Sequence, residues 1–426
     1  MKKIAIYVMT AAMVLTTAGC QKISDLVTGK TTTEQGLVDD RGKKLTVDEQ
    51  KAKVEETANI LMADLDKSVW EAEYEKVMNT VAILDQKEVD ATVIQEKLNA
   101  IVDLWTSVTG ENPNEVTKTL AKISDFKGHF TENAAGGFDY TEADDLQITV
   151  KAGENTVTIT YTATDSDIVY TLTEKENGSY LKAYVPKKVL STLILGNEQL
   201  AALEVNLDPK DVNGDGVWEE DTDKVNIGYA LTVGSYTMKI EQAEYATENA
   251  KASVKLFKGK DLVIGMNAKA VIKMEEVTVE DEAGSYTEPK VTPVSAEVTL
   301  DLAGKMQFMA TVPDFAKLEE ASNNVGSALE SKNEEAIAAA AAEFEKLLGV
   351  GVYYDGKNTL QATVGFEPFK EGENWDVLPV LRFADGTTYT MEDFTKDQKF
   401  ADIANNVMNW FQEMMDYLGI KTEPDA

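Results

Sequence analysis

The chain is poor in the side chains on which most catalytic and metal sites depend. Its 426 residues contain one cysteine, Cys20, one histidine, His129, and two arginines, Arg41 and Arg382. A single cysteine rules out an intramolecular disulfide, and zinc sites built from paired histidine and cysteine ligands cannot form within one chain. Forked arginine clamps for phosphate or carboxylate are nearly absent. Most enzyme classes are therefore excluded, whereas chemistry that needs only carboxylates, such as glycoside hydrolysis, stays open.

The single histidine gives little support to a serine-type nucleophile. A catalytic triad would have to use His129, which lies in the stretch Phe126–Phe130. Apolar and polar residues alternate there, and this pattern is typical of a half-buried strand. We therefore expect a structural or exposed histidine, and we expect no catalytic residue.

Positive charge is scarce. The chain has 41 lysine and arginine residues against 74 aspartate and glutamate residues, which gives a formal net charge of −33. A field of this sign repels nucleic acid and anionic lipid head groups and attracts cations. The charge excludes nucleic acid as a partner, and its plainest role is to keep the protein soluble.

Long hydrophobic runs are also lacking, with one exception at the N-terminus. Ile4–Leu15 is a run of 12 residues that follows Lys2 and Lys3 and precedes Thr17-Ala18-Gly19-Cys20. Spanning a bilayer takes about 20 apolar residues, so the run is too short for a permanent anchor. A basic start, a short apolar run and small residues before a cleavage point are the layout of a secretory signal peptide.

The residues before Cys20 resemble the lipobox of bacterial lipoproteins, although Thr17 stands where leucine is commonest. The resemblance implies an uncharacterised family of Gram-negative envelope lipoproteins in which Cys20 carries acyl chains such as palmitate. Several acyl chains hold a protein on a membrane effectively permanently, whereas one does so only marginally. Gln21 stands where an inner-membrane retention signal would have aspartate, so we expect the outer membrane, in either leaflet. The alternative is an ordinary secretory signal with a chance cysteine.

Hydrophobic periodicity predicts an α+β fold with N-terminal helical hairpins, a large antiparallel β-sheet region and a C-terminal α/β part that ends in a helix. Thr46 and Glu49 match a capping box, and Asp66-Lys67 breaks the first helical pattern. Residues 225–245 and 294–312 each read as strand throughout, and a last helix has its stripe between Phe400 and Leu418. The expected segments are the signal peptide 1–19, an acylated cysteine and flexible tether 20–45, a helical region 46–122, a β region 123–312 and a helix-strand-helix region 313–426.

One motif has the spacing of a calcium loop. Acidic or amide residues alternate from Asp211, and Gly216 permits a sharp turn. The expected ligands are Asp211, Asn213, Asp215, the carbonyl of Val217, Glu219 and either Asp221 or Asp223. Thr222 stands where an EF-hand needs a bidentate glutamate, and the flanking residues read as strands. The prediction is thus a calcium loop on a hairpin, and the alternative is a polar turn without an ion.

These observations favour a non-enzymatic, lipid-anchored envelope lipoprotein that binds a ligand or partner or has a structural role. The first alternative is a carrier of an apolar ligand or lipid, in the half-barrel-and-helix build that periplasmic lipoprotein carriers show. Its cavity would be lined by Met266, Ile272, Met274, Met306 and Phe308. The second alternative is a carboxylate-dependent enzyme acting on glycans, for which Trp218 and Trp375 are candidate sugar-stacking residues and otherwise core residues.

Overall fold

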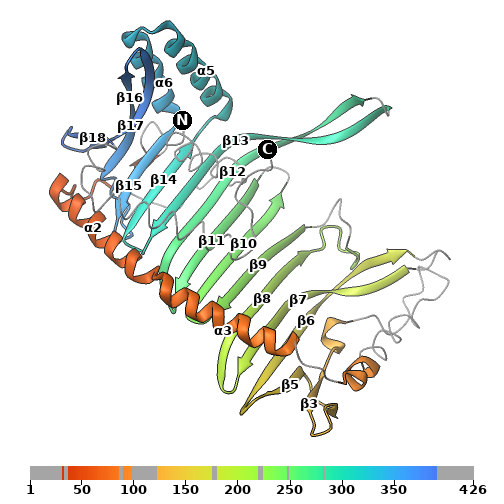
Figure 1. The fold of residues 1–426 in the computed structure, drawn as a ribbon. Coiled ribbons are helices and arrows are strands. Elements are labelled where there is room, and N and C mark those ends of the chain that lie inside the picture. Colours follow the sequence, from red (N-terminus) through yellow and green to blue (C-terminus); the bar gives the residue numbers. More distant parts are fainter. Residues whose placement is uncertain are drawn as a thin grey trace. The chain divides into compact units, whose positions relative to one another are not determined.

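The computed structural model describes residues 31–32, 37–85, 90–97, 122–174, 180–218, 224–246, 249–281 and 284–390. The chain forms two compact units: unit 1 takes residues 1–67 and 245–426, and unit 2 takes residues 68–244. Each unit holds a mostly antiparallel sheet and few helices, which confirms the α+β class (Figure 1). The predicted helix over Phe400–Leu418 and the helical pattern beyond Lys97 lie outside the described residues. No helix among the described residues is long and apolar enough to cross a lipid bilayer.

Unit 2 is a meander of strands with one parallel pair. Its sheet runs in the order β10-β9-β8-β7-β6-β5-β3-β4, and β3 pairs parallel to β5. The elements are α3 (Lys67–Asp85), η1 (Ile123–Asp125), β3 (Gly128–Glu132), β4 (Phe138–Thr141), β5 (Leu146–Ala152), β6 (Asn155–Glu174), β7 (Tyr180–Leu195), β8 (Glu198–Lys210), β9 (Lys224–Val233) and β10 (Tyr236–Ala246). The prediction of a continuous strand over 225–245 was wrong, because the chain turns at Gly234, whose φ is +56°.

Unit 1 continues the meander plan and adds a helical pair. Its sheet runs in the order β18-β17-β16-β15-β14-β13-β12-β11. The elements are β1 (Thr31–Thr32), β2 (Val38–Asp39), α2 (Val47–Asp64), β11 (Asn249–Lys258), β12 (Asp261–Asp281), β13 (Gly284–Leu302), β14 (Met306–Val312), α5 (Phe315–Ser331), α6 (Glu334–Leu347), β15 (Gly349–Tyr354), β16 (Ala362–Glu371), β17 (Asn374–Phe383) and β18 (Thr388–Thr390). The predicted strand over 294–312 is likewise a hairpin, which turns at Ala303-Gly304.

Helix α2 begins at the predicted capping box and lies across the hairpin turns of unit 1. The Thr46 side chain accepts a hydrogen bond from the Glu49 N–H, and the Glu49 carboxylate accepts one from the Thr46 N–H. Ion pairs then join the helix to three turns in succession: Lys53 to Asp355, Glu56 to Lys305, and Asp64 to Lys258. Lys53 and Asp64 are about 16 Å apart along the helix axis. The turns they meet are four strand spacings, or about 19 Å, apart, so the helix runs across the strands.

In unit 2, helix α3 likewise contacts the ends of several strands. Trp70 packs edge-on against Tyr236 at the start of β10, with ring centroids 5.5 Å apart. The carboxylate of Glu73 accepts hydrogen bonds from the Ser235 N–H and hydroxyl in the β9–β10 turn, at 3.0 Å and 2.9 Å. Lys76 pairs with Glu198 at the start of β8. Each unit thus has one end of its strands covered by a helix.

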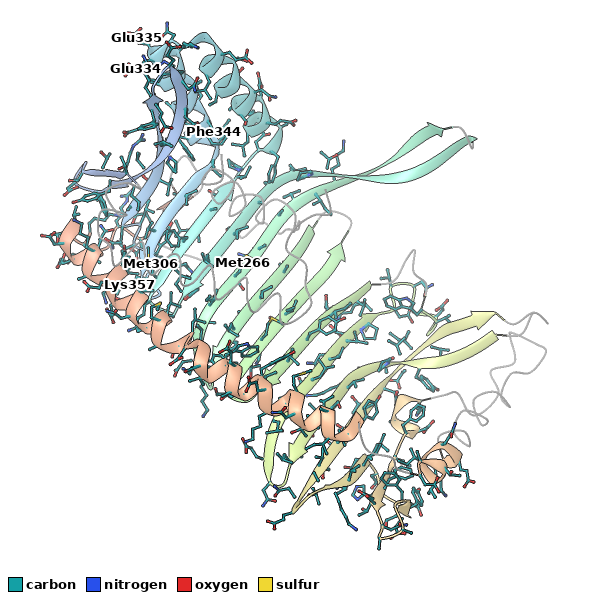
Figure 2. All side chains as sticks on the ribbon, viewed as in Figure 1. Met266, Met306, Glu334, Glu335, Phe344 and Lys357 are labelled. Carbon is teal, nitrogen blue, oxygen red and sulfur yellow. The ribbon has the colours of Figure 1, made fainter. Side chains whose placement is uncertain are left out.

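The sheet of unit 1 has one apolar and one polar face. Cross-strand register places Met266 beside Leu300, and Leu300 beside Phe308 and then Val352. The opposite face carries the ion pair between Lys269 and Glu297, 2.8 Å apart. Figure 2 labels Met266 and Met306, which lie on neighbouring parts of this sheet.

Two hairpins are longer than the strands beside them. In unit 1, β11 stops pairing with β12 at Val271 and β14 stops pairing with β13 at Ala296, but β12 and β13 remain paired to Asp281 and Gly284. This two-stranded extension, which we call the arm, projects from the sheet (Figure 1). In unit 2, β6 and β7 also continue as a pair beyond their neighbours.

Candidate functional site

The segment Leu37–Leu45, which follows the predicted anchor, is docked on unit 1. We call it the latch. Leu37 is fully buried against Tyr353 and Leu360, and the Tyr353 hydroxyl donates a hydrogen bond of 2.9 Å to the Val38 carbonyl. The predicted flexible tether over 20–45 was therefore wrong for residues 37–45. A buried leucine and a backbone hydrogen bond fix this part of the chain to the sheet.

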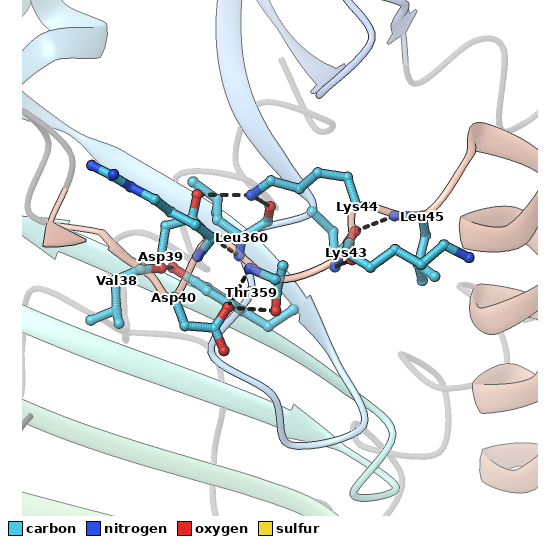
Figure 3. A network of polar contacts seen from close by, with 12 residues as sticks. Val38, Asp39, Asp40, Lys43, Lys44, Leu45, Thr359 and Leu360 are labelled. Atoms are coloured by element: carbon cyan, nitrogen blue, oxygen red, sulfur yellow. Dashed lines mark hydrogen bonds and ion pairs between the residues drawn. The ribbon is translucent and has the colours of Figure 1, made fainter. Parts of the chain in front are cut away.

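Charged hydrogen bonds complete the latch (Figure 3). Asp39 pairs with Lys44 at 2.8 Å and accepts the Leu360 N–H at 3.2 Å, while Lys44 donates to the Leu360 carbonyl. Thr359 donates its hydroxyl proton to Asp40 at 2.6 Å. Burial raises the pKa of Asp39, but hydrogen bonds from Lys44 and two backbone N–H groups outweigh burial and hold that pKa below its usual value. Every charge named here has a partner, so the network is suited to holding a segment in place.

The predicted calcium loop lies between β8 and β9, and its strand flanks are confirmed; the structure describes its first part, residues 211–218. Both carboxylate oxygens of Asp211 accept backbone N–H groups, from Gly214 and Gly216, each at 2.6 Å. Asp215 accepts the Val217 N–H at 2.8 Å, and both glycines have φ near +80°, where other residues are strained. The first half of the motif is thus folded around its own carboxylates.

No group of three or more histidine, cysteine or acidic side chains is placed to hold a metal ion in the part of the chain that the structure describes. The remaining expected ligands, Glu219, Asp221 and Asp223, lie outside that part. Calcium binding by this loop therefore stays a prediction.

The two candidate sugar-stacking residues belong to different units. Trp218 follows the predicted calcium loop in unit 2, and its backbone N–H donates to the Val169 carbonyl of β6 at 2.7 Å. Trp375 lies in β17 of unit 1, half-buried, with the Lys370 ammonium 5.2 Å from its ring centroid.

His129 lies in a strand, as the alternating pattern around it predicted. It lies in β3, and its Nε2 atom is 2.8 Å from Asp145, which precedes β5. The Gly128 N–H donates to the Asp145 carbonyl at 2.7 Å. The pair therefore joins β3 to the start of the strand beside it.

The apolar face of the unit 2 sheet was not predicted from the sequence as a candidate binding surface. Register places Leu203 beside Leu231 and then Met238, and Val205 beside Tyr229. Leu203 is 44% exposed and Tyr229 is 43% exposed, although both lie on central strands. The alternation of apolar and polar residues in β8 and β9 indicates that each strand has an apolar face. It does not indicate whether that face is exposed to solvent. We call the set Leu203, Val205, Tyr229, Leu231, Met238 and Ile240 the unit 2 face.

The residues expected to line a carrier cavity are partly brought together. Met266 and Phe308 share the apolar face of unit 1, on which Met306 also lies, and Ile272 is buried. The side chain of Met274 lies outside the description. A cleft of about 420 Å³ is found elsewhere, between α6 and β16–β17, and Arg382 pairs with Glu345 in its wall. Four of the residues that line this cleft are charged and four are apolar, so it is not the apolar cavity expected of a carrier.

Comparisons with protein-family models, with curated proteins and with solved structures found no match.

Proposed function

We propose that the protein is a non-enzymatic, lipid-anchored lipoprotein of the Gram-negative outer membrane that binds an apolar ligand through the unit 2 face. The observation that carries the binding role is the exposure of Leu203 and Tyr229 in the middle of a sheet. An acyl chain is the simplest ligand of this kind, so the proposal includes the carrier alternative.

The physical argument is the cost of leaving this surface in water. Burying a leucine side chain is worth about 1.5–3 kcal/mol, and contiguous exposed apolar patches on soluble proteins mark interaction sites. Leu203, Leu231 and Met238 are cross-strand neighbours, so their side chains form one surface. A ligand that covered it would remove several large apolar groups from water at once.

The latch supports the anchored part of the proposal. Cys20 and Leu37 are separated by at most about 60 Å of extended chain. Since Leu37 is fixed to unit 1, acylation of Cys20 would keep that unit within this distance of a membrane. A ligand taken from a lipid surface would thus be near its source.

The anchor is tested by metabolic labelling with radioactive palmitate followed by membrane fractionation. The full chain should be labelled and sediment with membranes, whereas Cys20→Ser should be unlabelled and soluble. An unlabelled full chain that is still cleaved and exported would contradict the anchor and identify an ordinary secretory signal.

The binding role is tested with cis-parinaric acid, a fluorescent fatty acid, and the mature chain in detergent. Leu203→Glu places a charge on the unit 2 face and should weaken binding at least about tenfold, in line with the loss of one buried leucine contact. Ala202→Glu is the matched control, because it adds the same charge on the opposite face of β8. Absence of binding by the unchanged chain, or equal loss in both variants, would contradict the proposal.

A second proposal, carried by the two backbone N–H groups on Asp211, is that calcium orders the loop from Asp211 to Asp223. Calcium should raise the midpoint of thermal unfolding of the chain, a chelator should reverse the shift, and Asp215→Ala, which removes the ligating oxygens, should abolish it. Asp208→Ala, on the strand before the loop, is the control. A shift that persists in Asp215→Ala would exclude this site.

A further inference from the structure

The arm is a two-stranded ribbon that the rest of the sheet does not support. The pairing of β11 with β12 ends at Asn249, which lies opposite Val271. The pairing of β14 with β13 ends at Val312, which lies opposite Ala296. Beyond these points, among the residues that the structure describes, β12 pairs only with β13, through ten further cross-strand pairs from Ile272 to Asp281. Two-stranded ribbons are marginally stable in water, and a third strand is the usual remedy.

The two edges of the arm differ in whether their backbone groups can form hydrogen bonds with a third strand. On β13, Pro289 lies opposite Glu276 and Pro293 lies opposite Ile272. Proline has no N–H, so within a ladder it occupies positions whose nitrogen faces away from the partner strand. The outer edge of β13 therefore lacks two donors, which is a known way to block strand addition.

The outer edge of β12 has no such block. Alternate pairs of an antiparallel ladder share one hydrogen-bond geometry. Thr278 opposite Thr287 is two residues along from Glu276 opposite Pro289, so the backbone groups of Thr278 also face outward. The same holds for Met274, Glu276 and Glu280. The stretch Met274–Asp281 contains no proline, so this edge presents a regular row of donors and acceptors.

Charge indicates what would pair with this edge. Met274–Asp281 contains four acidic residues and no basic one. A second copy of the chain would bring the same four acids and a net charge of −33 to the same place. A cationic segment is attracted by that field. We propose that the β12 edge of the arm binds an extended, lysine-rich polypeptide segment as an added strand.

The position of the arm suits a role in reaching a partner. The loop after β15, which holds the latch, lies beside the β13–β14 turn, where the Asp355 N–H donates to the Lys305 carbonyl. The tip of the arm is at the other end of β13, about 60 Å along the strand at the usual rise per residue. The arm thus presents its edge far from the end of unit 1 that holds the latch.

The test uses the full mature chain in detergent and a fluorescent eight-residue peptide of alternating lysine and valine. Thr278→Pro removes an outward N–H from β12 and should weaken peptide binding at least about tenfold. Thr287→Pro is the matched control, because it places the same residue in the same cross-strand pair but on the edge already interrupted by proline, and it should bind as the unchanged chain does. A glutamate-valine peptide should not bind.

Charge reversal provides a variant that leaves the backbone as it is. Glu276→Lys combined with Glu280→Lys should also weaken binding of the lysine-valine peptide. Failure of the unchanged chain to bind, equal loss in Thr278→Pro and Thr287→Pro, or equal binding of the acidic peptide would overturn the proposal. Concentration-dependent dimerisation that Thr278→Pro abolishes would overturn it in favour of a second copy.

Discussion

Asp39 joins two parts of the chain that lie 321 residues apart in sequence, since it accepts the Leu360 N–H and pairs with Lys44. The capping box of α2 could be predicted because its two members are three residues apart. The contacts of Asp39 could not be predicted, because the sequence pattern of residues 37–45 does not indicate that Leu360 lies beside it. The exposure of Leu203 could not be predicted either. Alternation of apolar and polar residues shows that the strand has an apolar face, but not whether another part of the chain covers that face.

We expect Asp39→Asn to lower the free energy of unfolding by about 1–2 kcal/mol at neutral pH, because it removes a partly buried charged hydrogen bond. The pKa of Asp39 is lowered by folding, so its contribution is present above the unfolded value near 3.9 and is lost as pH falls through the lower folded value. Urea unfolding at pH 7 and pH 3 measures both. Glu96→Gln, at an exposed position, is the control, and a difference that persists unchanged at low pH would contradict this account.

Two glycines should respond oppositely to the same substitution. A Cβ atom on Gly365 would lie 2.3 Å from the guanidinium carbon of Arg382, whereas one on Gly326 in α5 meets nothing within 4 Å. Gly365→Ala should displace the Arg382–Glu345 pair and cost about 1–3 kcal/mol, as the loss of a part-buried charged partner does. Gly326→Ala should stabilise by about 0.5–1 kcal/mol through helix propensity. Thermal unfolding of both variants tests this, and changes of the same sign would contradict it.

At the scale of elements, period-2 alternation located the strands but missed two turns. The turns at Gly234-Ser235 and Ala303-Gly304 are short and carry no cluster of polar turn residues, so each hairpin reads as a single strand. Ala303 has a φ of +54°, which a sequence pattern does not predict for alanine. The loop from Asp211 to Val217 was located correctly because its residues are polar and rich in glycine.

Trp70 should show how strongly α3 depends on its packing. It is 7% exposed, and its indole N–H has no acceptor among the described residues. Trp70→Ala should cost about 3–5 kcal/mol, since it empties a packed site. Trp70→Phe should cost less than about 1.5 kcal/mol, because it keeps an aromatic ring and removes a buried donor without a partner. Chemical denaturation of both variants is the measurement, and equal costs would contradict the role given to packing.

At the scale of the whole molecule, unit 1 is discontinuous in sequence and unit 2 is formed by residues 68–244. The predicted boundaries followed changes in the kind of secondary structure. The two compact units have different boundaries, because residues 37–67 pack on strands that come after residue 245. Local periodicity contains no information on that pairing.

The net charge of −33 should make the stability of the molecule depend on salt. Raising sodium chloride from 0.01 M to 0.1 M shortens the screening length from about 30 Å to about 10 Å and weakens repulsion between distant acids. The thermal midpoint should therefore rise over this range, in a buffer with chelator to remove any effect of calcium. A fall would mean that screened ion pairs outweigh the repulsion.

The way α2 meets successive hairpin turns has a consequence for how such a chain can change in length over evolution. One more hairpin adds about 10 Å to the width of a sheet, and covering that width takes between six and seven helical residues. This is close to two helical turns, so an insertion of about seven residues would keep the same side of the helix toward the turns. Lineages of this protein should thus differ by matched insertions, one hairpin in the sheet for each two turns in the helix, and unmatched insertions should be rare.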